Sequence, residues 1–148
     1  MITYESLNEQ NHKITELTNI LNRLLVDRFI CDAQTTHELF FRYIELVRTH
    51  LKETENNIYS VLLSQGDQEA RNAANSFMSG SKEIKRVYDK YLKRWCKPKT
   101  CELIIKDYDR FLEDTDELFE MVLDRIQAET EQLYPLVRKV TGDVSAVA

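Results

Sequence analysis

Apolar residues recur at intervals of three, four and seven positions in four stretches of the chain, the period of amphipathic α-helices. The first stretch predicts a helix from about Ser6 to Phe29, whose inward stripe is Leu7, Ile14, Leu17, Leu21, Leu24 and Leu25. The second begins after CDAQTTHELFF, where Thr35 and Glu38 have the spacing of a capping box. Its stripe is Phe40, Tyr43, Ile44, Val47, His50, Leu51, Ile58 and Leu62.

The stop between the second and third helices is predicted at Gln65-Gly66-Asp67. We expect Gly66 to take the left-handed conformation that ends many helices, and Asp67 to cap the next helix. The third helix is predicted from about Gln68 to Arg94, with a bend or a later start at the SGS sequence of residues 79–81, because glycine weakens a helix interior. The KPK sequence of residues 97–99 closes it.

The fourth helix is predicted from about Thr100 to Val140. The polar DTDE sequence at 114–117 is a possible interruption, and Pro135 predicts a kink near the C-terminal end. Gly142 and DVSAVA have the character of a frayed tail. The fold class predicted is therefore all-α, an antiparallel up-down-up-down four-helix bundle, with one domain over residues 1–141 and a flexible tail over 142–148.

Composition agrees with this class, since 148 residues contain only three Gly and two Pro. A formal net charge of -5 argues against nucleic acid as a partner. The charge is uneven, however: residues 82–99 are rich in Lys and Arg, and residues 102–131 are rich in Asp and Glu. Two interpretations stay open, namely mutual pairing between neighbouring helices and a docking surface.

The N-terminal residues lack the pattern of a signal peptide, and no apolar run has the length of a membrane span, so we expect a cytoplasmic protein without a membrane partner. Three cysteines in a reducing compartment favour free thiols. Cys96 and Cys101, with the four residues KPKT between them, leave a zinc site or a redox-sensitive bridge as alternatives.

Two segments, HLKETENNIYSVLL from His50 and RIQAETEQLYPL from Arg125, look like two copies of one helical face. His and carboxylate side chains three or four residues apart are the groups with which helical bundles hold metals. With LNEQNHKITELTNIL, these segments resemble the hemerythrin family over roughly residues 7–137.

The resemblance implies a metal site in the bundle core, but only part of the ligand set is present. His12 and His50 stand where the family has ligand histidines, and Glu129 stands at the carboxylate of the second HxxxE motif. Three positions depart from the pattern, namely Thr54, Ser81 and Arg125. Glu55, one residue beyond Thr54, is turned ~100° around the helix.

Arginine at position 125 changes the expected chemistry, because a guanidinium stays protonated and repels metal ions. We expect Arg125 to pair with Glu129 in place of a metal and expect no cofactor. The functional prediction is a non-enzymatic regulatory or adaptor protein, with Glu113, Asp116 and Glu120 attracting a basic protein partner. A weaker resemblance to the bacterial anti-sigma regulators called regulator of sigma D, carried by His50 to Tyr59, points the same way.

Two alternatives remain. The first is a sensor that binds iron, another metal or a small ligand in the core through His12, His50 and Glu129. The second is a homodimer joined through exposed Tyr and Leu side chains of the first two helices.

Overall fold

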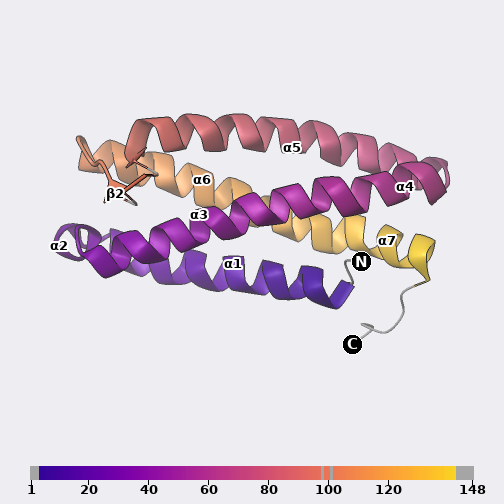
Figure 1. Ribbon diagram of the computed structural model, residues 1–148, viewed down its shortest axis with the longest axis horizontal. Helices are drawn as coiled ribbons and strands as arrows, with labels where there is room; N and C mark the ends of the chain where they lie inside the picture. Colours follow the sequence, from indigo (N-terminus) through magenta and orange to yellow (C-terminus); the bar gives the residue numbers. More distant parts are fainter. Residues whose placement is uncertain (1–3, 98, 101, 143–148) are drawn as a thin grey trace.

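The chain is all-α apart from one short hairpin, as a computed structural model describes it for residues 4–97, 99–100 and 102–142 (Figure 1). The first half contains the helices α1 (Tyr4–Leu25), α2 (Arg28–Cys31) and α3 (Gln34–Thr54), the π-helical segment η1 (Glu55–Tyr59) and α4 (Ser60–Gln65). The second half contains α5 (Gln68–Trp95), the strands β1 (Cys96–Lys97) and β2 (Glu102–Leu103), α6 (Tyr108–Ala128), the π-helical segment η2 (Glu129–Leu133) and α7 (Tyr134–Thr141).

The long helices lie side by side (Figure 1). Helix α1 packs against α3, α5 packs against α6, and α1 also contacts α6. Helix α2 and the hairpin lie at one end of the molecule, while α4 and α7 lie at the other (Figure 1). Among the described residues, no helix has the length and apolar character needed to cross a membrane.

The first helix ends earlier than the sequence predicted. It stops at Leu25, and the Asp27 side chain accepts hydrogen bonds from the amides of Phe29 and Ile30 at 2.9 and 3.0 Å, which starts the separate helix α2. A carboxylate that satisfies two free amides favours a new helix start over continuation. Phe29 consequently lies outside the apolar stripe and is 89% exposed.

The predicted capping box at Thr35 is wrong. The N-cap of α3 is Ala33, which has no side-chain cap, and Thr35 lies inside the first turn. Glu38 accepts a hydrogen bond from Gln34 at 3.1 Å instead of reaching back to Thr35. The neighbouring Thr36 donates to the Ile30 carbonyl at 2.7 Å and so ties α3 to α2.

The stop after α4 was predicted at the correct place but with the wrong conformation at Gly66. Its φ is -83°, so it is extended and not left-handed. Glycine is needed here for space, since a Cβ would lie 2.4 Å from the Leu62 carbonyl oxygen and 2.5 Å from the Ala70 Cβ. The predicted cap is confirmed, because Asp67 accepts from the Ala70 amide at 2.9 Å.

The predicted start of the third helix at Gln68 is confirmed, and the alternative of a later start is wrong, because α5 runs without a break through residues 79–81. The fourth helix begins at Tyr108 and not at Thr100, because Cys96 and Lys97 pair with Leu103 and Glu102 in the antiparallel β1–β2 hairpin. Asp107 then caps α6 by accepting from the Arg110 amide at 3.1 Å. The DTDE sequence at 114–117 does not interrupt α6.

Cys31 and Cys96 are free, buried thiols. Cys101 lies outside the described residues, and so do the zinc and bridge alternatives that depend on it. Gly142 follows α7 in the left-handed conformation with a φ of 71°, and residues 143–148 of the predicted tail also lie outside the described residues. Pro135 is the second residue of α7, directly after the wide turn η2, where the missing proline N–H costs less than in a regular helix interior.

The apolar core consists of two clusters along the length of the helices. The larger contains the aromatic side chains Phe40, Tyr43, Tyr91, Trp95, Phe111 and Phe119. The smaller contains Leu7, Tyr59, Phe77, Leu133 and Tyr134. The residues between these two clusters form the candidate site.

Candidate functional site

Each long helix passes from one apolar cluster to the other at a buried polar residue. The residues are Asn11 on α1, His50 and Thr54 on α3, Ser81 on α5, and Glu129 at the end of α6. All are 7% exposed or less. Burial of polar groups costs free energy unless hydrogen bonds replace those to water, so their partners decide what this polar layer does.

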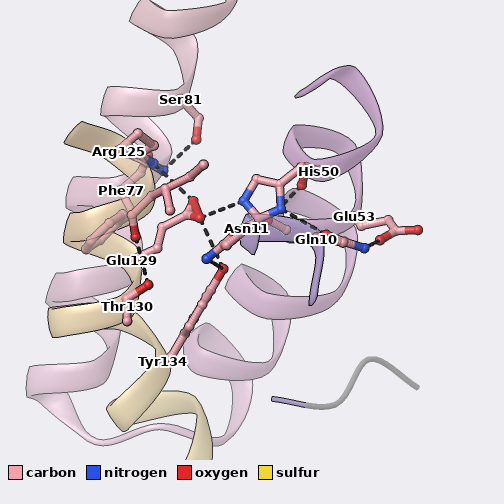
Figure 2. Close-up of polar contacts among 12 residues, drawn as sticks. Gln10, Asn11, His50, Glu53, Phe77, Ser81, Arg125, Glu129, Thr130 and Tyr134 are labelled. Atoms are coloured by element: carbon pink, nitrogen blue, oxygen red, sulfur yellow. Dashed lines mark hydrogen bonds and ion pairs between the residues drawn. The ribbon is translucent and has the colours of Figure 1, made fainter. Parts of the chain in front are cut away.

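Glu129 lies at the centre of the polar layer and is 0% exposed (Figure 2). Its Oε1 lies 2.6 Å from His50 Nε2 and accepts a hydrogen bond from the Tyr134 hydroxyl at 3.2 Å. Its Oε2 lies 3.3 Å from Arg125 Nε. The Tyr134 hydroxyl in turn accepts from the Asn11 amide at 2.9 Å, which links α1 to the same network.

Arg125 fills the space beside Glu129 on the α5 side (Figure 2). Its Nη2 donates to the Phe77 carbonyl at 2.8 Å, to Ser81 Oγ at 2.7 Å and to the Tyr59 hydroxyl. Its guanidinium carbon lies 4.5 Å from the centre of the Phe77 ring, within the range of a cation–π contact. The side chain is only 10% exposed, so this charge is held in the interior.

Gly80 makes room for Arg125. A Cβ at this position would lie 2.7 Å from Arg125 Nη1, closer than any relaxed contact. Any shift of the guanidinium to admit this Cβ would disturb its hydrogen bonds to three acceptors and to Glu129. The residue that seemed to weaken α5 in the sequence is therefore explained by the close approach of the arginine.

His50 is held through both ring nitrogens. Nδ1 lies 2.9 Å from Gln10 Oε1, and the Gln10 amide nitrogen donates to the Glu53 carboxylate (Figure 2). Nε2 faces Glu129. The network therefore runs from the half-buried Gln10 and Glu53 to the fully buried Glu129.

Two wide turns bring tyrosines to the polar layer. In a regular α-helix, residues five apart lie ~140° from each other around the axis, whereas a π turn brings residue i+5 back over residue i. Segment η2 thus brings the Tyr134 hydroxyl to the Glu129 carboxylate, and Tyr59, at the end of η1, lies with its hydroxyl 2.9 Å from Ser81 Oγ. The two similar sequence segments correspond to two similar local structures, each with a fully buried tyrosine.

Burial raises the pKa of both tyrosines, and for Tyr134 the negative charge of Glu129 acts in the same direction. For Tyr59 the hydrogen bond with Ser81 and the charge of Arg125 oppose the effect of burial. Both phenols are protonated at neutral pH. They act as neutral hydrogen-bonding groups that complete the network.

The described residues do not fit the diiron centre that the resemblance implies. His12 is exposed and takes no part in the network, while His50 and Glu129 have no free ligand atom. Thr54 donates to the His50 carbonyl at 2.8 Å, and Glu55 is exposed and pairs with Lys85. Within the described part of the chain, no three His, Cys, Asp or Glu side chains gather as a metal site would require.

Among the described residues, the space between His50 and Arg125 is too small for a ligand. The cavity next to His50 and Arg125 has a volume of about 10 Å³. That is at most the space of one water molecule. Protein side chains fill the position that a core ligand would need.

The acidic residues singled out in the sequence lie elsewhere, on the outer face of α6. Glu113, Asp116 and Glu120 are exposed, and their spacing of three and four places them on one side of the helix. Glu113 lies 3.9 Å from Arg110, while Asp116 and Glu120 form no ion pair with any described residue. Between the basic α5 and the acidic α6, the ion pair found among described residues is Arg94–Asp114 at 3.2 Å.

Sequence reasoning missed Gln10, Asn11 and Phe77, which hold His50, Tyr134 and Arg125 respectively. Gln10 and Asn11 directly precede His12. The signal that could have identified them is their position around the helix axis, which decides whether a residue of this segment points inward or outward. Comparison of the chain with protein-family models, curated proteins and solved structures gives no match.

Proposed function

We propose that this protein is a non-enzymatic regulatory or adaptor protein that acts by contact with a basic protein partner. The observation that carries the proposal is Arg125, whose guanidinium occupies the polar layer with its hydrogen bonds satisfied by protein. Among the described residues, both ring nitrogens of His50 and both carboxylate oxygens of Glu129 are bonded to protein, and the cavity next to His50 and Arg125 has a volume of about 10 Å³. The surface is then the part of the molecule left to act.

We further propose that the helices form an antiparallel four-helix bundle of hemerythrin-like type in which the Arg125–Glu129 pair replaces the metal. Support comes from the position of His50 and Glu129, which face each other across α3 and η2 at 2.6 Å. Two of the three side chains to which the resemblance assigns ligand positions thus lie together, while the third, His12, is exposed. The arginine between α5 and η2 takes over the structural role of bridging the helices.

The partner-binding surface in this proposal is the outer face of α6 around Glu113, Asp116 and Glu120. Exposed carboxylates on one face attract a basic surface over about a Debye length, roughly 8 Å at physiological ionic strength. Of these three, Asp116 and Glu120 form no ion pair with a described residue, and Glu113 lies 3.9 Å from Arg110. Complementary charge accelerates association and selects partners more than it adds affinity. Binding is therefore expected to weaken as salt is raised.

The test compares two triple variants of equal net charge as baits in a lysate of the protein's own source cells. One carries Glu113→Lys, Asp116→Lys and Glu120→Lys, and the other carries Lys at the exposed positions Glu16, Glu38 and Glu45. We expect wild type and the second variant to retain the same salt-sensitive basic protein, and the first variant to lose it. Equal capture by both variants, or no protein retained by wild type, would contradict the proposal.

A further inference from the structure

A cleft between α5 and α6 gathers positive charge in an otherwise acidic protein. Its volume is about 210 Å³, and Arg86, Lys90 and Arg94 of α5 and Arg110 of α6 line it together with Asp114 and Glu117. Four cations and two carboxylates line the cleft. Outside the lining, Glu83 lies 2.5 Å from Arg86 and Glu113 lies 3.9 Å from Arg110, which leaves Lys90 as the lining cation without an ion pair to any described residue. This site is separate from the polar layer, and it adjoins the acidic face proposed above at Arg110, which lies 3.9 Å from Glu113.

The cations on α5 repel one another in the free protein. Arg86, Lys90 and Arg94 follow one another at intervals of four, so their charges are neighbours on one helical face. Like charges at this spacing destabilise a helix by a few tenths of a kcal/mol per pair. Arg86 is offset by Glu83, but Lys90 forms no ion pair with any described residue. An anion in front of Lys90 would relieve this repulsion.

Asp114 bridges the two arginines at the hairpin end of the cleft, Arg94 and Arg110, whose side chains are 46% and 52% exposed. Asp114 accepts a hydrogen bond from Trp95 Nε1 at 3.0 Å and lies 3.2 Å from Arg94 Nη1 and 3.3 Å from Arg110 Nε. Its side chain is 17% exposed, and the Arg94 guanidinium also lies over the Trp95 ring, 5.1 Å from its centre. One carboxylate thus holds two guanidinium groups, whose remaining N–H donors outnumber its acceptors.

The geometry points to a binding site for a phosphate group, carried free or as a small organic phosphate monoester. Arginine guanidinium groups present planar pairs of donors that match phosphate oxygens, and lysine adds a compact charge. The cavity has room for a phosphate with a small substituent. Glu117, which forms no ion pair with described residues, lines the α6 side of the cleft and opposes anion binding there.

The test is calorimetric titration with inorganic phosphate and with glycerol 2-phosphate at constant ionic strength. We expect saturable binding that Lys90→Gln weakens about tenfold, the cost of one lost hydrogen bond to a charged group. Glu117→Gln should tighten binding. Lys93→Gln removes an exposed lysine from the same helix outside the cleft and should change nothing.

Binding of both compounds would assign organic phosphates as ligands, whereas binding of inorganic phosphate alone would assign the free ion. No saturable binding of either compound would overturn the inference. Equal weakening by Lys90→Gln and Lys93→Gln would also overturn it, since that result indicates general charge attraction. All three substitutions are at exposed positions, and helical circular dichroism checks that each variant is folded.

Discussion

Replacement of Arg125 by Met tests whether the buried ion pair holds the polar layer together. Methionine keeps the apolar stem over Phe77 but removes the charge and the donors to Ser81, Tyr59 and the Phe77 carbonyl. Glu129, which is 0% exposed, would then remain in the interior without its arginine. Loss of one partner of a buried pair costs about 3–5 kcal/mol.

The free energy of unfolding is measured by urea denaturation followed by circular dichroism. For a chain of this size, each kcal/mol lowers Tm by about 2–4 °C, so the variant should melt about 6–20 °C below wild type. Arg48→Met is the matched control, since Arg48 pairs with Glu45 on the surface at 2.6 Å. Exposed pairs contribute about 0–1 kcal/mol, so this control should change little.

A second substitution separates the charge from the loss of packing. Glu129→Gln is isosteric and keeps an acceptor for His50 and Tyr134 but carries no charge. The double variant Arg125→Met/Glu129→Gln should therefore lose less stability than the sum of the two single variants, by about 1–3 kcal/mol. Additive losses, or a cost of Arg125→Met no larger than that of Arg48→Met, would show that the buried Arg125–Glu129 pair does not hold the polar layer together.

Three further predictions concern individual residues. Gly80→Ala should destabilise wild type, although alanine ordinarily favours a helix by about 1 kcal/mol, because the added Cβ meets Arg125 Nη1. In the Arg125→Met background this contact is absent, and the same substitution should be stabilising. Thermal melts of wild type, the two single variants and the double variant test both expectations. Burial raises the pKa of Cys31 to about 11 and of Cys96 to about 12. Above about pH 9 the unfolded chain therefore loses thiol protons that the folded chain keeps, and the free energy of unfolding falls as pH rises. Cys96→Ala should reduce this fall between about pH 8 and about pH 10.5, as measured by urea unfolding at the two pH values. Asp67→Ala should cost about 1 kcal/mol in urea unfolding through loss of the α5 cap, and no change would contradict that role.

Much of the fold could be predicted from the sequence because the apolar stripes are long and regular. The apolar stripe from Phe40 to Leu62 continues through the π-helical segment η1. The additional residue of this wider turn lies between two apolar positions, so the stripe is not interrupted. The errors lie at helix ends, where one or two side chains determine the residue at which a helix begins or stops. Asp27 begins a new helix after Leu25, and the β1–β2 pairing delays the start of α6, and neither effect has a periodic signal.

The candidate site could be predicted only in part. The HxxxE-like spacing indicated that Arg125 and Glu129 would pair, and they lie 3.3 Å apart. The contact of His50 with Glu129 joins residues 79 positions apart, and sequence spacing within one helix carries no information on such pairs. The role of Gly80 was equally hidden, because glycine in a helix indicates flexibility unless the group that approaches it is known.

The most direct test of the account is the metal content of the purified, untagged protein after growth in medium supplemented with iron and zinc. Mass spectrometry of the intact protein under native conditions and elemental analysis together give the number of metal ions per chain. We predict a folded protein with far less than one iron or zinc per chain, because Arg125 occupies the polar layer and both ring nitrogens of His50 are bonded. Near-stoichiometric metal that is lost in the His50→Ala variant would contradict it and favour a metal sensor.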